Sequence, residues 1–138
     1  MYRMSNENER LSAPEALAGR WAMLLRTRRR DGSWVDTPVN VAVDGDRAYF
    51  GTPANSGKVK RLRNFDRVEV GPCTPRGKIR GPVFEARARL LRDAEAEAAL
   101  RRLRRRHPFV YRVPVPLEHL IKRTHGVVYE LSGFDPLA

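Results

Sequence analysis

Closely spaced turn signals are the feature of this sequence that most restricts its fold. Asp31-Gly32, Asp44-Gly45-Asp46 and Thr74–Gly77 each combine residues that favour tight turns. The segments around them are short and partly alternate apolar with polar residues, which is typical of strands. Parallel neighbours need a crossover of a dozen or more residues, and strands this closely packed leave little room for one. An antiparallel sheet is therefore predicted.

Six strands are expected in this sheet. Their predicted ranges are 21–27, 33–43, 48–52, 67–73, 82–91 and 127–132. Pro38 cannot donate a ladder hydrogen bond, so the second strand must lie at an edge or contain a bulge. Closing an antiparallel sheet removes its exposed edges. We therefore expect a mainly β (α+β) fold, a six-stranded antiparallel barrel with a few short helices.

Three helical segments are expected, one before the first strand and two between later strands. Ser12 and Glu15 have the spacing of a capping box, which predicts a short helix ending by Gly19. In the segment 55–64, two apolar side chains three residues apart lie among basic ones, which indicates an amphipathic helix. A third helix is expected over 94–106, with the preceding aspartate as its N-cap.

Length and composition indicate one domain. With 138 residues and 41% hydrophobic residues, the chain can bury a core. We expect a flexible tail over 1–10 and a single domain over 11–138. No apolar run approaches the ~20 residues of a membrane span, and the polar start is not suited to a secretory signal, so neither is expected. Cys73 is the one cysteine, which fits a reducing cytoplasm and predicts a small buried residue.

The net charge of +11 has two interpretations. It indicates a polyanionic partner, either nucleic acid or a phosphate-bearing, acid-tailed cofactor. Alternatively, it reflects an arginine-rich composition of the kind that GC-rich coding gives. The arginine runs of the segment 101–106 have no recognised nucleic-acid signature around them, and they are interpreted as the solvated face of a helix.

Three segments, in order, resemble a known family. They are Arg29–Val39, Tyr49–Asn64 and Val68–Gly77. Together they are similar to the deazaflavin (F420)-dependent branch of the pyridoxamine-phosphate-oxidase-like oxidoreductases, over about residues 12–134. The resemblance implies an FMN-binding type of split β-barrel and a homodimer with two cofactors in grooves between the subunits. It also implies hydride transfer to a small-molecule substrate.

The start of the predicted helix 55–64 is the candidate phosphate site. A helix N-terminus offers unpaired N–H groups and partial positive charge. Lys58 and Arg61 are three residues apart and share a helix face, whereas Lys60 points elsewhere. The alternative is a solvated basic helix. By resemblance, the residues expected to hold the cofactor phosphate are Asn55, Ser56, Gly57, Lys58 and Arg61.

The second predicted strand is the candidate wall for the cofactor ring. Thr37, Pro38 and Val39, with Asn40, combine an apolar surface with backbone polar groups, although an edge strand with a bulge explains the same residues. Relatives that bind flavin mononucleotide (FMN) commonly carry an arginine here, and this sequence has none. That favours F420 over FMN. Thr52, at the end of the third strand, is a further candidate for hydrogen bonding to the cofactor.

These observations lead to one hypothesis and three alternatives. The hypothesis is an oxidoreductase that transfers hydride from reduced F420 to an unsaturated organic acceptor. The alternatives are an FMN enzyme of the same fold, a non-catalytic carrier of a cofactor or lipophilic ligand, and a basic nucleic-acid-binding module. No residue stands out as a catalytic acid. The histidines have no ligand spacing, so no metal site is expected.

Overall fold

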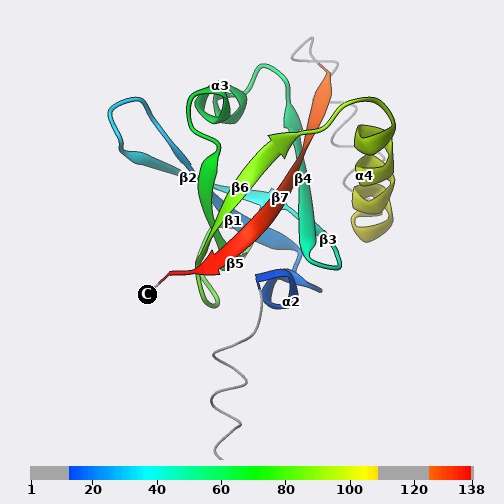
Figure 1. Ribbon diagram of the computed structural model, residues 1–138. Helices are drawn as coiled ribbons and strands as arrows, with labels where there is room; N and C mark the ends of the chain where they lie inside the picture. The colour runs from blue at the N-terminus through cyan, green and yellow to red at the C-terminus, as the bar shows by residue number, and fades with distance from the viewer. Residues whose placement is uncertain (1–12, 109–124, 138) are drawn as a thin grey trace, which may run out of the picture.

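The computed structural model describes residues 13–108 and 125–137, which form one antiparallel sheet and three helices (Figure 1). The helices are α2 (Ala13–Leu17), α3 (Gly57–Asn64) and α4 (Asp93–Arg106). The strands are β1 (Ala22–Arg28), β2 (Trp34–Asn40), β3 (Ala42–Asp44), β4 (Arg47–Pro53), β5 (Arg67–Cys73), β6 (Phe84–Leu90) and β7 (Gly126–Pro136). They are ordered β2-β1-β5-β6-β7-β4-β3. Within the described ranges, no helix is long and apolar enough to cross a membrane.

A bend at Val41 explains why seven strands are present where six were expected. The predicted strand 33–43 is divided there into β2, which pairs with β1, and β3, which pairs with β4. The two halves therefore lie at opposite ends of the strand order. One bent stretch of chain thus joins both edges of the sheet and curls it into a split barrel. The predicted fold class is confirmed.

The inner face of the sheet forms the main core. Met23 and Leu25 on β1 and Val68 and Val70 on β5 are fully buried there, together with Phe50 on β4. Two helices lie at opposite ends of the barrel (Figure 1). Leu17 of α2 packs into one end, and α3 buries its apolar side chains at the other. Burying each large aliphatic side chain stabilises the fold by about 1.5–3 kcal/mol.

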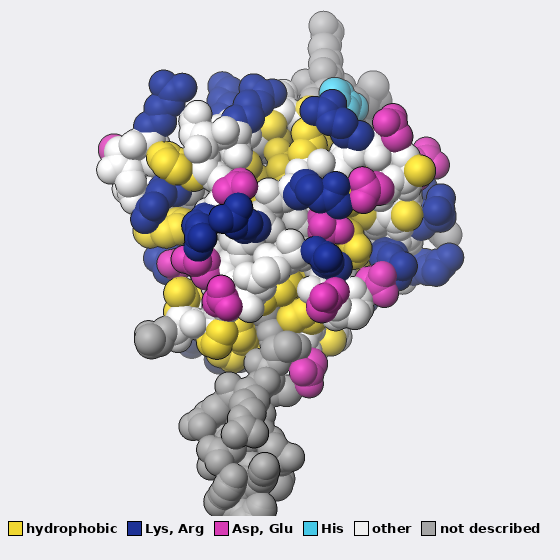
Figure 2. Space-filling model, in the orientation of Figure 1, with side chains coloured by type: hydrophobic (Ala, Val, Ile, Leu, Met, Phe, Trp, Pro, Cys, Tyr) yellow, Lys and Arg dark blue, Asp and Glu magenta, His cyan; other side chains and the backbone are white. Residues whose placement is uncertain are grey.

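Helix α4 covers the outside of β3, β4 and β7 (Figure 1). Its buried residues Ala99 and Leu103 pack on the outer-face side chains Tyr49 and Val128. The arginines of its C-terminal half are mostly exposed, as expected for a solvated face. In the view of Figure 2, basic and acidic side chains are interspersed over the surface.

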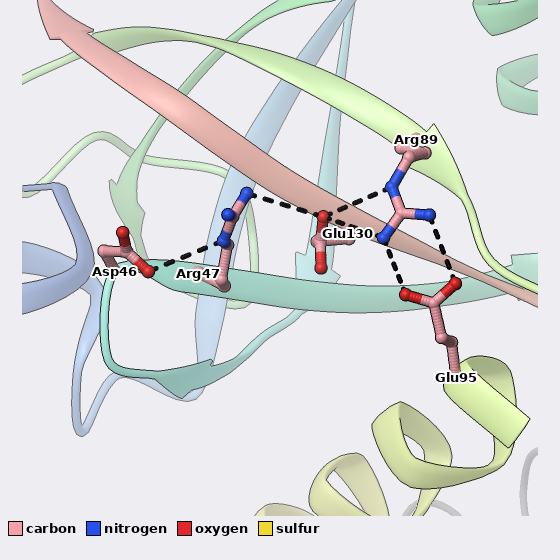
Figure 3. A network of polar contacts seen from close by, with 5 residues as sticks. All are labelled: Asp46, Arg47, Arg89, Glu95 and Glu130. Atoms are coloured by element: carbon pink, nitrogen blue, oxygen red, sulfur yellow. Dashed lines mark hydrogen bonds and ion pairs between the residues drawn. The ribbon is translucent and has the colours of Figure 1, made fainter.

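A polar network on the outer face connects the sheet to the start of α4 (Figure 3). Arg89 of β6 contacts Glu130 of β7 and, through both terminal nitrogens, Glu95 in the first turn of α4. Arg47 of β4 contacts the same Glu130 at 3.6 Å and Asp46 at 3.5 Å. The hydrogen bonds from Arg89 lower the pKa of the Glu95 carboxyl. The network links the first turn of α4 to β6 and β7, and it contributes little to the stability of the fold because exposed ion pairs are weak.

Three predicted boundaries differ from the structure. Asp93 is the first residue of α4, with φ of 53°, and Arg92 occupies the N-cap without a side-chain hydrogen bond, so the predicted Asp93 cap is wrong. Helix α3 begins at Gly57 rather than at residue 55, because the N–H of Ser56 closes a turn onto the carbonyl of Pro53. Strand β7 continues to Pro136, where it still pairs with β6. Ser12 and the expected tail lie outside the described residues.

Candidate functional site

The first backbone N–H groups of α3 are not capped by the side chain of the N-cap residue. Ser56 is the N-cap residue in extended conformation, and its hydroxyl makes no capping hydrogen bond. That hydroxyl instead lies 3.0 Å from the hydroxyl of Thr52, which is a buried residue near the end of β4. The first N–H groups of a helix need partners and carry partial positive charge. This terminus can therefore bind an anion, with two hydroxyl groups beside it.

Arg61 supplies a cation beside this helix start. Its side chain is half-buried, and its Nε donates a hydrogen bond of 2.6 Å to Oγ1 of Thr27 on β1. Burial lowers the pKa of Arg61, and the positive charge of Arg29 lowers it further. None of the ion pairs between described residues includes Arg61. A guanidinium in this position favours a bound anion.

The lack of a side chain at Gly57 leaves space for the Arg61 guanidinium. A Cβ at Gly57 would lie 2.7 Å from Nη1 of Arg61, which is closer than real Cβ contacts come, and 3.6 Å from its Cζ, which is an ordinary contact. The guanidinium therefore lies directly against the first residue of α3. The helix terminus and the cation are parts of one candidate anion site.

The other predicted residues of the helix agree with the expected helical phase. Lys58 is half-buried, as Arg61 is, whereas Lys60 is exposed. Val59 and Leu62 form the buried face. Asn55 is exposed in the turn between β4 and α3. The structure thus brings Ser56, Gly57 and Arg61 together.

The predicted ring wall on β2 is divided between two faces. Thr37 and Val39 lie opposite Leu25 and Met23 of β1 and share the inner face with them, whereas Pro38 points the other way. This division follows from the alternation of side chains along a strand. The four predicted residues of this strand therefore do not form one flat surface. Only the inner-face pair can contribute side chains to a ring that lies against the barrel interior.

The remaining two β2 residues have local structural roles. The side-chain amide of Asn40 donates to the carbonyl of Trp21 at 3.0 Å, which ties the end of β2 to the chain before β1. Pro38 is exposed, and β2 is the terminal strand of the sheet, which confirms the predicted edge position. An edge strand leaves backbone groups on one side without sheet partners. These groups are available to the polar rim of a ligand.

The register connects the anion site to the inner face of β2. Thr27, which binds Arg61, lies opposite Val35, and the next inward residue of β2 is Thr37. Two residues along a strand span about 7 Å. The candidate phosphate site and the inner half of the predicted ring wall therefore lie at the same end of the barrel.

Two functional candidates were missed from the sequence, Thr27 and Arg29. Thr27 is fully buried and follows Met23 and Leu25 at the inward positions of β1. A polar residue in an inward row was the available signal. The positive charge of Arg29, on the β1–β2 hairpin, lowers the pKa of Arg61 on α3, and no local sequence pattern indicates that the two are close.

The other candidates do not form a site. Cys73 is buried, as expected, and burial raises the pKa of its thiol. His107 is buried against the barrel, and His119 lies outside the described residues. Within residues 13–108 and 125–137, no group of three or more His, Cys, Asp or Glu side chains is arranged to hold a metal.

Comparison with known proteins decides the fold. No family model matches the sequence, and no curated protein does. Among solved structures, the chain is similar to an F420 reductase, with 20% identity, a TM-score of 0.60, and coverage of 90% of this chain and 93% of that one. A pyridoxamine 5′-phosphate oxidase-like protein from Listeria innocua gives 15% identity and a TM-score of 0.59, covering 88% and 92%. The chain has the split-barrel fold.

The same fold also occurs in a protein with a different ligand. HutZ, the heme storage protein from Vibrio cholerae, has 11% identity and a TM-score of 0.60, covering 88% of this chain and 89% of that one. Split barrels similar to this chain therefore include oxidoreductases and a heme storage protein. At such low identities the likeness concerns the fold alone, and the ligand has to be argued from the residues of this chain.

Proposed function

We propose that this protein is an oxidoreductase that binds F420 and transfers hydride from the reduced cofactor to an unsaturated organic acceptor. The observation that carries the proposal is the Arg61 guanidinium. It is half-buried beside the start of α3 and makes no ion pair with a described carboxylate. The resemblance of the segments around it to deazaflavin-dependent enzymes supports the choice of cofactor, and so does the likeness in fold to an F420 reductase.

The residues present fit a phosphate-bearing cofactor. Arg61, Lys58 and the first N–H groups of α3 would hold the phosphate, and the Ser56 and Thr52 hydroxyls lie beside them. The inner face of β2 and its free backbone edge would contact the ring. The cofactor supplies the hydride. The protein orients it and excludes water from the apolar side of the ring.

F420 is proposed over FMN because β2 carries no arginine. The one polar side chain at the end of this strand, that of Asn40, is bound to the carbonyl of Trp21. A second cation for a terminal phosphate dianion is therefore missing from β2. The phosphate site that remains, at α3, depends on Arg61 and Lys58. We expect F420 to bind more tightly than FMN for this reason.

A carrier function is the second candidate, and the likeness to a heme storage protein favours it. A carrier and an enzyme of this fold differ in turnover rather than in binding. Titrations with heme as a third ligand show which ligand is preferred, and a turnover assay with reduced cofactor distinguishes an enzyme from a carrier. The nucleic-acid alternative differs in salt dependence, because duplex binding loses orders of magnitude in affinity between ~50 and ~200 mM salt.

Titration of the full chain with F420, FMN and heme at one ionic strength tests the proposal. Fluorescence quenching reports the first two ligands, and absorbance reports heme. The expected result is tightest binding of F420, followed by its oxidation when enones or quinones are added to the reduced form. Equal or tighter binding of FMN contradicts the cofactor choice. Binding of F420 without turnover over a broad acceptor panel indicates a carrier.

A further inference from the structure

The Arg61 side chain is hydrogen-bonded to one residue and lies against another that is far from the first in the sequence. It leaves α3 in the second turn and runs back toward the beginning of the same helix. Its Nε is fixed by the Thr27 hydroxyl at 2.6 Å, and its Nη1 lies against Gly57. A guanidinium has five N–H donors. With one used by Thr27, the donors on the two terminal nitrogens face the start of the helix.

We propose that Thr27 and Gly57 are positioning residues, which orient the Arg61 guanidinium toward an anion at the start of α3. The inference deepens the proposed function and rests on it, because the anion is taken to be the cofactor phosphate. Thr27 fixes the inner nitrogen, and Gly57 leaves the space in which the outer nitrogens lie.

The surroundings of Thr27 show that packing alone does not explain its hydroxyl group. Its side chain is fully buried at an inward position of β1, where the neighbouring inward residues Met23 and Leu25 are apolar. Valine has nearly the same shape and is favoured in strands. Core packing alone therefore does not require a hydroxyl here. The hydrogen-bond partner that the structure gives this hydroxyl is Arg61 Nε.

Gly57 is not required by the backbone. It is not among the glycines with positive φ, and alanine is the better helix former at a helical position. What a methyl group would meet is the Arg61 guanidinium, at 2.7 Å from Nη1. An alanine here favours the helix and displaces the cation. The substitution should therefore raise the stability of the protein and weaken anion binding.

The arrangement also places two like charges close together. Arg29, on the β1–β2 hairpin, lowers the pKa of Arg61 through its positive charge. An anion bound at the start of α3 reduces this repulsion. A rigidly held guanidinium gains more from such an anion than a mobile one, because little rotational freedom remains to be lost on binding.

Five proteins test the inference: the wild type and the variants Arg61→Ala, Thr27→Val, Thr27→Ser and Gly57→Ala. Affinity is measured with F420, with FMN and with inorganic phosphate, the last by the shift of the Arg61 Nε–H resonance in ¹⁵N-labelled protein. Thermal unfolding without ligand is the structural control. Arg61→Ala should weaken cofactor binding about ten- to a hundredfold, as expected for charge-assisted hydrogen bonds to phosphate.

The expected pattern is specific to a positioning role. Thr27→Val should weaken binding about three- to tenfold, less than Arg61→Ala, because the cation remains and loses only the hydrogen bond that orients it. Thr27→Ser should restore binding to within about twofold. Gly57→Ala should weaken binding by a similar factor while raising the unfolding temperature. In Thr27→Val, the Arg61 Nε–H should exchange faster with water, even without ligand.

The failures can be told apart. If Arg61→Ala weakens cofactor binding but Thr27→Val matches Thr27→Ser, the positioning inference is overturned and the phosphate site stands. If Arg61→Ala leaves F420 and FMN affinity unchanged, the phosphate site fails, and the inference fails with it. If the wild type binds neither cofactor, the proposed function fails, and the phosphate titration still decides whether Thr27 and Gly57 orient an anion ligand.

Discussion

His107 joins the C-terminal end of α4 to the bend that closes the barrel, and its titration gives a quantitative test of that joint. Its ring is 3% exposed, and its Nε2 donates to the carbonyl of Val41 at 2.8 Å. Nδ1 is buried, and no hydrogen-bond partner for it exists in the described part of the chain. The ring also meets that of Trp21 edge to face, with centroids 6.1 Å apart.

Burial lowers the pKa of His107 below its ordinary value. The hydrogen bond to Val41 opposes this shift, and the positive charge of Arg106 adds to it. The unfolded chain therefore binds a proton at this residue near pH 6.5, whereas the folded protein binds it only at lower pH. The contribution of neutral His107 to the stability of the protein is fully present above about pH 6.5. It is lost as the pH falls from there through the lower pKa that His107 has in the folded protein.

Two substitutions separate the hydrogen bond from the charge. His107→Gln can still donate to Val41 and does not titrate, so it should match the wild type near pH 8 and should be less sensitive to acid. His107→Phe removes the donor and leaves the Val41 carbonyl buried without a partner. That costs about 1–3 kcal/mol near pH 8, where the wild-type ring is neutral. In a chain of this length it corresponds to a loss of roughly 2–12 °C in unfolding temperature.

Urea denaturation between pH 8 and pH 5 measures both effects, because carboxyl groups titrate mostly below this range. The difference between wild type and His107→Gln should be small at pH 8 and should grow as the pH falls. A difference that stays constant across this range would refute the reasoning. A His107→Phe variant as stable as wild type at pH 8 would show that the contact to Val41 contributes nothing.

Three further predictions concern packing, the phosphate site and assembly. Leu103→Ala should cost about 2–5 kcal/mol in urea denaturation, because the side chain is fully buried under α4, whereas the exposed neighbour Arg104→Ala should change stability by no more than about 0.5 kcal/mol. Lys58→Ala should weaken F420 binding about ten- to a hundredfold in fluorescence titrations and Lys60→Ala much less; the reverse order would mean that the wrong helix face has been assigned. Light scattering at micromolar concentration should show a dimer, since the resemblance to deazaflavin-dependent enzymes implies a cofactor groove between two subunits, and a monomer that binds the cofactor tightly would exclude such a groove.

Local patterns were sufficient to predict most of the fold. The Asp31-Gly32 turn, the alternation along the strands and the apolar pair Val59 and Leu62 correspond to elements in the structure. The bend at Val41 was not predicted, because the stretch around it has the pattern of one strand and its contacts are long-range, such as the hydrogen bond from His107, sixty-six residues away. Likewise, the end of β7 depends on pairing with β6, which no pattern within 133–136 indicates.

The candidate site was predicted in part for the same reason. Ser56, Gly57 and Arg61 are neighbours in the sequence, so a helical phase places them together. The hydroxyl that orients Arg61 comes from Thr27, on a strand thirty-four residues earlier. The opposite orientation of Thr37 and Pro38 follows from strand alternation and was already implied by the expected strand. In this protein, neighbouring residues indicate the candidate site and long-range contacts set its geometry.

The position of β7 has a consequence for how the protein is made. This strand follows all the other described strands in the sequence, yet it lies inside the sheet, between β6 and β4. Its register joins Ala48 to Leu131, so that much of the sheet depends on contacts between distant residues. Such topologies fold slowly. Until β7 is inserted, β4 and β6 each have one edge without a partner, and unpaired strand edges of this kind favour aggregation.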